Sequence, residues 1–187
     1  MRIIAGKFKG RRLKTLKGLQ IRPTSDRVRE ALFSILGDMV RGSRVLDLFA
    51  GSGALGLEAL SRGAEEVVFV EKDRDAREII RENITALAID ASCEVIPGDY
   101  RNVLKRLGNK DGSFNLILAD PPYQDTEAGA AENVLSLIGE SDTLRENGLV
   151  VIEHSHRVKI NIPDSSWEII QFKRYGRSCL TIIGREK

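Results

Sequence analysis

The chain has 187 residues, of which 42% are hydrophobic and 30% are charged, a composition typical of one globular domain with a buried core. No apolar run approaches the length of a membrane-spanning helix, and residues 1–7 lack the features of a signal peptide, so we expect a cytoplasmic protein without a membrane segment. The two cysteines, Cys93 and Cys179, lie far apart without metal-ligand spacing. They argue against a disulfide framework, and we expect no metal site.

The net charge of +2 hides an uneven distribution along the chain. The first 25 residues contain eight basic residues and no acidic one, so residues 26–187 carry a net charge of −6. A basic arm on an acidic domain is typical of a surface that binds nucleic acid, although a solvated tail is the alternative. Apolar residues and glycines between the charges favour a folded hairpin over a tail. We therefore predict an RNA-binding extension at residues 1–22 and a main domain at 23–187, with these RNA contacts: Lys7, Lys9, Arg11, Arg12, Lys14 and Arg22.

Hydrophobic periodicity then predicts helices and strands that alternate along the chain. The first helix begins after a cap at Thr24 or Ser25 and ends near Met39. Strands are expected at residues 44–49, 66–71, 93–97, 115–120 and 149–153, and helices between them at 53–62, 73–87, 100–107 and 128–138. The chain ends in an antiparallel pair, residues 167–175 and 178–184. Alternation of this kind predicts a parallel sheet covered by helices on both faces.

A glycine-rich turn follows the strand at residues 44–49. Residues 51–56 read Gly-Ser-Gly-Ala-Leu-Gly, the spacing G-x-G-x-x-G between a strand and a helix. Glycines let the backbone approach a ligand, and a helix N-terminus offers free N–H groups. Dinucleotide-binding folds use the same device, so the motif alone leaves a nucleotide-dependent oxidoreductase open.

Acidic residues at the ends of the first three strands narrow the choice of ligand. Asp47 would repel a pyrophosphate but suits an ammonium group, and Glu71 is placed to accept hydrogen bonds from ribose hydroxyls. Asp99, which precedes Tyr100, could accept from an adenine amino group. Each carboxylate could instead cap a helix, as we expect of Asp73. Ribose, adenine and an ammonium group without phosphate describe S-adenosylmethionine, and its predicted site comprises Asp47, Gly51, Gly53, Glu71, Asp99 and Tyr100.

The fourth strand ends in an acceptor-rich turn, Asp120-Pro121-Pro122-Tyr123. Neither proline nitrogen carries a hydrogen, so the turn offers many acceptors and few donors. The carboxylate and backbone carbonyls could accept the hydrogens of a planar amino group, such as that of a nucleobase, while Tyr123 stacks on its face. A rigid proline turn with a packed Tyr123 is the structural alternative.

Together these motifs resemble a known family. Residues 47–53 and 120–123 resemble the paired signature of class I amino-methyltransferases. Residues 2–13, 22–33 and 173–177 resemble the bacterial RsmD family, which methylates guanine N2 in small-subunit ribosomal RNA. The resemblance covers nearly the whole chain, although phenylalanine often stands in the family where this chain has Tyr123. It implies an α/β, Rossmann-like class I methyltransferase fold, with a seven-stranded, mostly parallel sheet whose last strand is antiparallel.

The resemblance also implies an activity and its partners. The expected reaction transfers a methyl group from S-adenosylmethionine to guanine N2 of 16S ribosomal RNA, either as free RNA or as a small-subunit assembly particle. The motifs by themselves indicate only a planar amine. An adenine-N6 or protein-glutamine methyltransferase and a non-catalytic RNA-binding module therefore stay open. The oligomeric state is also open, and we favour a monomer.

Four further residues have more than one interpretation. His154 and His156 flank Ser155 after the fifth strand, but no third metal ligand lies nearby in the sequence. They are predicted to be surface or hydrogen-bonded histidines. Arg27 and Arg29 could face either the carboxylate of the cofactor or RNA phosphates.

Overall fold

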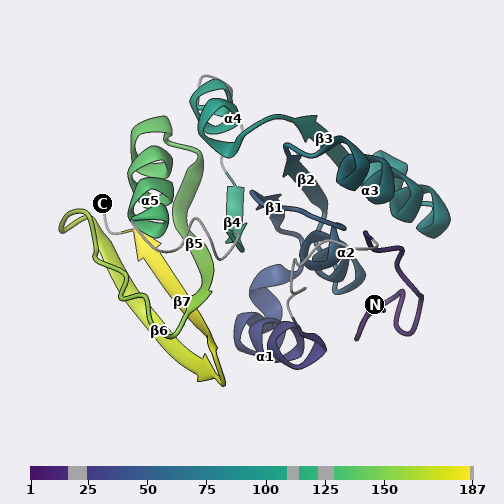
Figure 1. Ribbon diagram of the computed structural model, residues 1–187, viewed down its shortest axis with the longest axis horizontal. Helices are drawn as coiled ribbons and strands as arrows, with labels where there is room; N and C mark the ends of the chain where they lie inside the picture. Colours follow the sequence, from purple (N-terminus) through teal and green to yellow (C-terminus); the bar gives the residue numbers. More distant parts are fainter. Residues whose placement is uncertain (17–24, 109–113, 122–128, 186–187) are drawn as a thin grey trace.

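A computed structural model describes residues 1–16, 25–108, 114–121 and 129–185, and it places one mixed sheet between two layers of helices (Figure 1). The strand order is β3-β2-β1-β4-β5-β7-β6. Neighbours from β3 to β5 are parallel, whereas β7 runs antiparallel to both β5 and β6. The predicted seven-stranded sheet with an antiparallel last strand is thereby confirmed. The strands are β1 (Arg44–Asp47), β2 (Glu66–Glu71), β3 (Cys93–Pro97), β4 (Phe114–Ala119), β5 (Leu144–Ser155), β6 (Trp167–Tyr175) and β7 (Ser178–Arg185).

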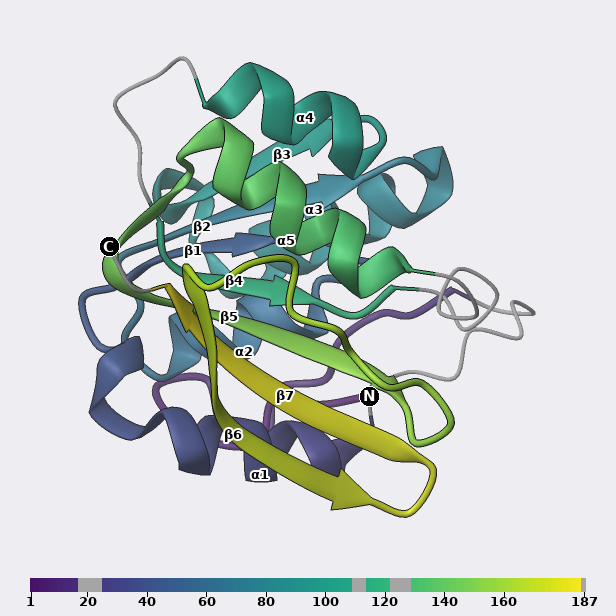
Figure 2. The same ribbon diagram turned by 90° about the vertical axis from the view of Figure 1, so that its left-hand side faces the viewer.

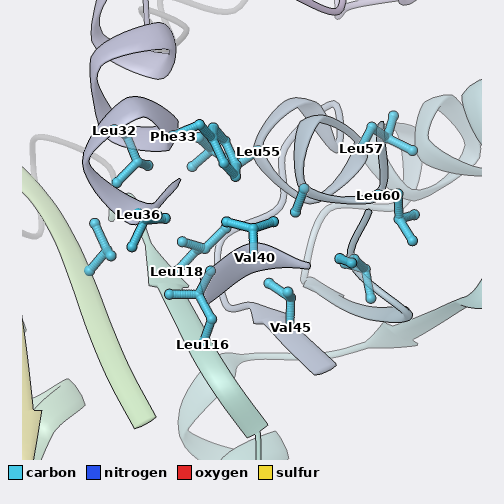
Figure 3. Close-up of a cluster of buried hydrophobic side chains, with 14 of the residues drawn as sticks. Leu32, Phe33, Leu36, Val40, Val45, Leu55, Leu57, Leu60, Leu116 and Leu118 are labelled. Atoms are coloured by element: carbon cyan, nitrogen blue, oxygen red, sulfur yellow. The ribbon is translucent and has the colours of Figure 1, made fainter. Parts of the chain in front are cut away.

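The helices divide between the two faces of the sheet. One face is covered by α1 (Asp26–Leu36), α2 (Ala54–Ser61) and α3 (Arg74–Leu87), and the other by α4 (Tyr100–Leu107) and α5 (Ala130–Ser141). Strands buried on both faces have continuous apolar sequences, and adjacent residues such as Val45 and Leu46 enter opposite cores. Figure 3 shows the core beneath α1 and α2, with Leu32, Phe33, Leu36, Val40, Val45, Leu55, Leu57, Leu60, Leu116 and Leu118 labelled.

Several element boundaries differ from the sequence expectation, most clearly the end of the first helix and the start of β5. The first helix is capped by Ser25, whose side chain accepts from Val28 N at 3.3 Å, but it ends at Leu36 and continues as a 3-10 turn, Gly37–Val40. Strand β5 begins at Leu144 and not at residue 149, because the pairing with β4 shifts by several residues near its start. Periodicity could not show this shift, since the irregular residues are exposed and polar. Within the described residues, no helix is both long enough and apolar enough to cross a membrane.

The described part of the basic arm, residues 1–16, folds back on itself as predicted, with a single antiparallel bridge between Arg2 and Arg12 and no regular strands. Ile3 N donates to Arg11 O at 3.0 Å, and Leu13 N donates to Met1 O at 3.0 Å. Ile3 and Leu13 are buried in the core that also contains α1 and α2. The division of the chain at residue 22 stays a prediction, because residues 17–24 lie outside the described part.

A buried carboxylate on α2 holds the arm in place. Glu58 is fully buried, and its two oxygens accept hydrogen bonds from Ile4 N at 2.7 Å and Ala5 N at 3.0 Å. Arg62 Nε donates to the same carboxylate at 2.8 Å, and Arg29 Nε lies 3.8 Å from it. Because amides of the arm and two cations share this one group, Glu58 links the arm to both α1 and α2.

Arg29 has a structural position beneath the arm and does not face solvent. Its side chain is fully buried, and Nη2 donates to Arg2 O at 2.7 Å and to Asp26 Oδ1 at 2.9 Å. The interpretation that Arg29 faces RNA phosphates is therefore wrong, because the side chain is buried beside Glu58 and turned towards the arm. Contact with the carboxylate of the cofactor stays a prediction. Arg27 is exposed, and its role stays open.

Gly6 permits the close contact between the arm and the end of α2. A Cβ at this position would lie 1.8 Å from Ser61 O, and the backbone has a φ of +81°. The next two residues complete the contact, since Lys7 N donates to Ser61 O at 2.7 Å and Phe8 N to Ser61 Oγ at 2.9 Å. Only glycine satisfies both the space and the backbone conformation here.

Replacement of Glu58 by alanine should strongly destabilise the protein. The substitution leaves the fully buried Arg29 with Asp26 as its only carboxylate partner among the described residues and removes the acceptors of two arm amides. Together these losses should cost about 3–5 kcal/mol in the free energy of unfolding. Urea denaturation of Glu58→Ala measures this loss. The control is Glu66→Ala, which breaks a partly exposed pair with Arg44 and should cost less than about 1 kcal/mol. Equal losses in both variants would contradict a central role for Glu58.

Candidate active site

The candidate site lies between β1 and β4, where the connections that follow the two strands leave towards opposite faces of the sheet. Strands β1 and β4 are parallel neighbours, but the helix after β1 packs on one face of the sheet and the helix after β4 packs on the other. An open α/β sheet binds its ligands at the carboxyl ends of the strands, at such a switch point. Four predicted site residues end or follow adjacent strands at this edge, in the order Asp99, Glu71, Asp47 and Asp120.

The glycine-rich turn connects β1 to α2 at this edge. Gly53 N donates to Ala50 O at 2.7 Å and directly precedes α2. Gly56 lies within the helix, where a Cβ would come within 2.3 Å of Cε1 of Phe69. The third glycine of the motif therefore lets α2 pack closely on β2, while the first two form the turn.

Asp47 is a carboxylate buried beneath the turn. It is 1% exposed, and Oδ2 accepts from Gly56 N at 3.1 Å. Oδ1 has no hydrogen-bond partner among the described residues. Burial raises the pKa of Asp47 to about 7, the charge of Glu71 adds to the rise, and the backbone N–H groups of Gly56 and Phe49 lower it. An unpaired buried oxygen is costly, so this position is a candidate for contact with a ligand.

Glu71 joins the two loops that follow β1 and β2. Oε2 accepts from Gly51 N at 2.8 Å, and Oε1 accepts from Asp73 N at 2.8 Å. The carboxylate thus fixes the glycine-rich turn relative to the start of α3. Each of its oxygens retains capacity for another hydrogen bond, so this structural role is compatible with ribose binding.

The third acidic residue has a clear structural role as a helix cap. Asp99 accepts from Arg101 N at 2.9 Å and caps α4, just as Asp73 accepts from Ala76 N at 2.8 Å and caps α3. Tyr100 is buried, and its ring lies 4.8 Å from the ring of Phe49, centroid to centroid. The cap at Asp73 was expected, whereas cofactor contacts by Asp99 and Tyr100 stay predictions.

The acceptor-rich turn begins directly after β4. Asp120 is partly buried and Pro121 is buried, which places the start of the turn beside the end of β1. Pro122 and Tyr123 lie outside the described residues, so stacking by Tyr123 stays a prediction.

Asn83 connects the arm to the glycine-rich turn, a role that sequence reasoning missed. The side chain is 2% exposed, and Oδ1 accepts from Lys14 N at 2.8 Å. Nδ2 donates to Lys14 O at 3.1 Å and to Ser52 O at 3.1 Å. A polar residue among the apolar positions of α3 was the available signal, because a buried amide requires partners.

The basic side chains of the arm are mostly exposed. Lys7, Lys9 and Arg12 have no ion pair within the part of the chain that is described. Arg11 donates to a backbone carbonyl of α3, and Lys14 pairs with a glutamate of α3 at 3.1 Å. Arg22 lies outside the described residues, and RNA binding by this set stays a prediction.

Both histidines are hydrogen-bonded, as predicted, His154 at the end of β5 and His156 just after it. His154 is 3% exposed, with Nδ1 3.0 Å from Ser155 O and Nε2 2.8 Å from Thr181 Oγ1. A carbonyl can only accept, so Nδ1 carries the hydrogen and Nε2 accepts from the threonine. Burial lowers the pKa of His154, and Nδ1 of His156 lies 3.2 Å from Arg177 O. In the described ranges, no three His, Cys, Asp or Glu side chains are grouped to hold a metal ion.

The sheet order, the antiparallel β7 and the acid-lined edge define a Rossmann-like class I methyltransferase fold. The solved structure of yhhF from Escherichia coli matches with a TM-score of 0.85 and 32% sequence identity, over 100% of this chain and 98% of that chain. The family model described as conserved hypothetical protein 95 matches residues 1–184. The chain belongs to this family, which confirms its resemblance to the RsmD proteins.

Named relatives cover nearly the full length of the chain. YlbH of Bacillus subtilis is 37% identical over 184 residues, which is 97% of both proteins. Ribosomal RNA small subunit methyltransferase D of Haemophilus influenzae is 37% identical over 177 residues, which is 94% of this chain and 89% of the relative.

The raised pKa of Asp47 predicts how the stability depends on pH. Between about pH 4 and pH 7 the folded protein holds a proton that the unfolded chain releases, so stability should fall as pH rises through this range. The loss is on the order of 1.4 kcal/mol per pH unit at most. In Asp47→Asn this contribution disappears, and urea denaturation at pH 5 and pH 8 should show a smaller decrease than in the wild type. Parallel pH profiles for the two proteins would contradict the assignment.

Proposed function

We propose that this protein transfers a methyl group from S-adenosylmethionine to the exocyclic N2 of a guanine in small-subunit ribosomal RNA. The observation that carries the proposal is the buried Asp47 beneath a glycine-rich turn, at the same edge of the sheet as Glu71 and Asp120. The relative from Haemophilus influenzae is named as a methyltransferase of small-subunit ribosomal RNA, which supports the substrate class.

The residues at this edge fit S-adenosylmethionine better than a dinucleotide. Asp47 and Glu71 place two carboxylates beside the turn, where they would repel a pyrophosphate. The unpaired Oδ1 of Asp47 can accept a hydrogen bond, and a nearby ammonium group would favour its ionised form. Glu71 can accept from ribose hydroxyls, and Asp99 from an adenine amino group. When bound, S-adenosylmethionine supplies a methyl group already activated on a sulfonium.

Asp120 and Pro121 would prepare the accepting amine. The lone pair of an exocyclic guanine nitrogen is delocalised into the ring, which makes the amine a weak nucleophile. Acceptance of its two hydrogens by the Asp120 carboxylate and the Pro121 carbonyl favours a more tetrahedral nitrogen with a localised lone pair. Because β4 pairs with β1, this acceptor pair is held next to the cofactor edge, and such alignment provides much of the acceleration.

The rest of the turn would hold the base. Tyr123 is proposed to stack on the purine, an interaction of about 1–3 kcal/mol. The target must be unpaired or flipped out of a helix to reach the turn. Methylation leaves a positive charge on the nitrogen, which can release its extra proton to the Asp120 carboxylate or to water after transfer, so Asp120 does not have to be a strong base.

The proposal also includes the assembly state of the RNA substrate, the oligomeric state of the enzyme and its cellular compartment. The RNA is proposed to be either free or part of an assembly particle, and the enzyme to be a monomer. Both cysteines are free thiols, which is consistent with a reducing cytoplasm.

The proposal predicts that Asp120→Ala abolishes methyl transfer while cofactor binding stays nearly unchanged. Loss of one preorganised polar group commonly lowers kcat by about 10²–10³-fold. A labelled-methyl assay on small subunits from cells lacking this protein measures transfer, and calorimetry measures the Kd for S-adenosylmethionine. Asp38→Ala removes an exposed acid far from the site and serves as control. Retained transfer in Asp120→Ala would refute the assignment.

The modified nucleoside from the same assay separates the alternatives. N2-methylguanosine supports the proposal. N6-methyladenosine would instead identify adenine as the substrate, and a methylated glutamine would identify a protein substrate. RNA binding without transfer by the wild type would indicate a non-catalytic module.

The arm should contribute salt-sensitive RNA binding. In the triple variant Lys7→Gln, Lys9→Gln and Arg12→Gln, the slope of log K against log salt should decrease by up to about one unit per lost phosphate contact. Filter binding at several salt concentrations gives the slope, and affinity for S-adenosylmethionine should not change. An unaltered slope would show that the arm does not contact phosphates.

A further inference from the structure

The β6–β7 hairpin has a composition that the site described above does not explain. Residues 169–185 contain four basic residues and no acidic one. Ile169, Ile170 and Phe172 of β6 are 42%, 56% and 54% exposed, and they form most of the exposed large hydrophobic residues in the described ranges. An edge strand with apolar side chains is prone to unwanted pairing, so their exposure calls for a functional explanation.

Strand register places this hairpin level with the acceptor-rich turn. One row across the sheet contains Ala119, Ile152, Thr181 and Phe172. The next row towards the carboxyl edge contains Lys173, and Asp120 follows β4 at the same level. Three strand spacings of about 4.8 Å separate β4 from β6, so the backbone of Lys173 lies about 14 Å from that of Asp120. An RNA strand covers this distance with a few nucleotides. Figure 2 shows the turn between β6 and β7 on the same side of the molecule as the end of β4.

Exposed cations gather at this end of the hairpin. None of them forms an ion pair within the described part of the chain, and the loop after β5 joins them because His156 N donates to Arg177 O at 2.9 Å. Residues 26–187 as a whole carry a net negative charge, so this concentration is local. The exposed cations are Arg157, Lys159, Lys173, Arg174 and Arg177.

Phe172 gives the basic surface an aromatic platform. Its ring centroid lies 6.3 Å from that of His154, whose ring is fixed by the hydrogen bond to Thr181. The Phe172 side chain therefore lies over the carboxyl end of β5 while about half of it remains exposed. Cations combined with an exposed aromatic ring are typical of surfaces that bind single-stranded nucleic acid.

We infer that the tip of the β6–β7 hairpin binds the RNA strand next to the target nucleotide. Lys173, Arg174 and Arg177 contact phosphates, and Phe172 stacks on an unpaired base. The inference rests on the proposed function, because it assigns the same RNA a second contact. The arm packs on α2 and α3, over the opposite end of the sheet, so the two basic surfaces hold the RNA on either side of the Asp120 turn.

The test compares two triple variants of the full-length protein with equal changes in charge. The tip variant carries Lys173→Gln, Arg174→Gln and Arg177→Gln. The control carries Lys105→Gln, Arg106→Gln and Arg145→Gln, which are exposed cations at the amino edge of the sheet. Both are assayed with small subunits from cells lacking this protein and with unmodified small-subunit ribosomal RNA, and urea midpoints confirm that both fold.

The tip variant should raise the KM for RNA about tenfold and lower the salt slope by up to about three units, with unchanged affinity for S-adenosylmethionine. The control should change KM less than about twofold. Phe172→Ala should weaken binding to unpaired RNA and leave binding to duplex RNA unchanged.

Equal KM values for the tip and control variants would overturn the inference. So would a loss confined to intact subunits with normal binding to naked RNA, because that result identifies a protein partner for the hairpin. If the wild type transfers no methyl group to RNA, the proposed function is wrong, and the salt slopes of the two variants still decide whether the hairpin binds RNA.

Discussion

The site depends on the parallel pairing of β1 with β4. Val45, Leu46 and Asp47 pair with residues 116–118, which are about seventy positions away in the sequence. The chain leaves these two strands towards opposite faces of the sheet, so the edge between them stays uncovered by either connection. This pairing brings the glycine-rich turn and the Asp120 turn together, and each turn alone would be half of a site.

Polar side chains then fix the segments that surround this edge. Glu58 holds the arm on α2, Asn83 links the arm to the glycine-rich turn, and Glu71 links that turn to the start of α3. Each of these groups is satisfied by backbone amides or carbonyls, as burial requires. Asp47 differs, because one oxygen lacks a described partner and burial raises the pKa. A buried polar atom without a hydrogen-bond partner is the kind of exception that is expected at functional sites.

The charged side chains are also distributed around this edge of the sheet. Carboxylates line the edge of β3, β2, β1 and β4, where a cationic methyl donor is proposed to bind. Basic residues concentrate in the arm and at the tip of the β6–β7 hairpin, on either side of that edge. The net charge is small because an acidic surface and a basic surface offset each other. The acidic surface suits the cationic methyl donor, and the basic surface suits RNA.

The sequence by itself determined the alternation of elements, the glycine-rich turn, a helix cap at Thr24 or Ser25, and the cap at Asp73. These features are local, because periodicity and capping depend on residues within one or two turns of chain. Only the tertiary structure decided that Arg29 faces the arm and that β5 starts at Leu144. It also placed Phe172 level with the end of β4. Partners distant in the sequence are selected by strand register and by burial, and neither leaves a signal in a single segment.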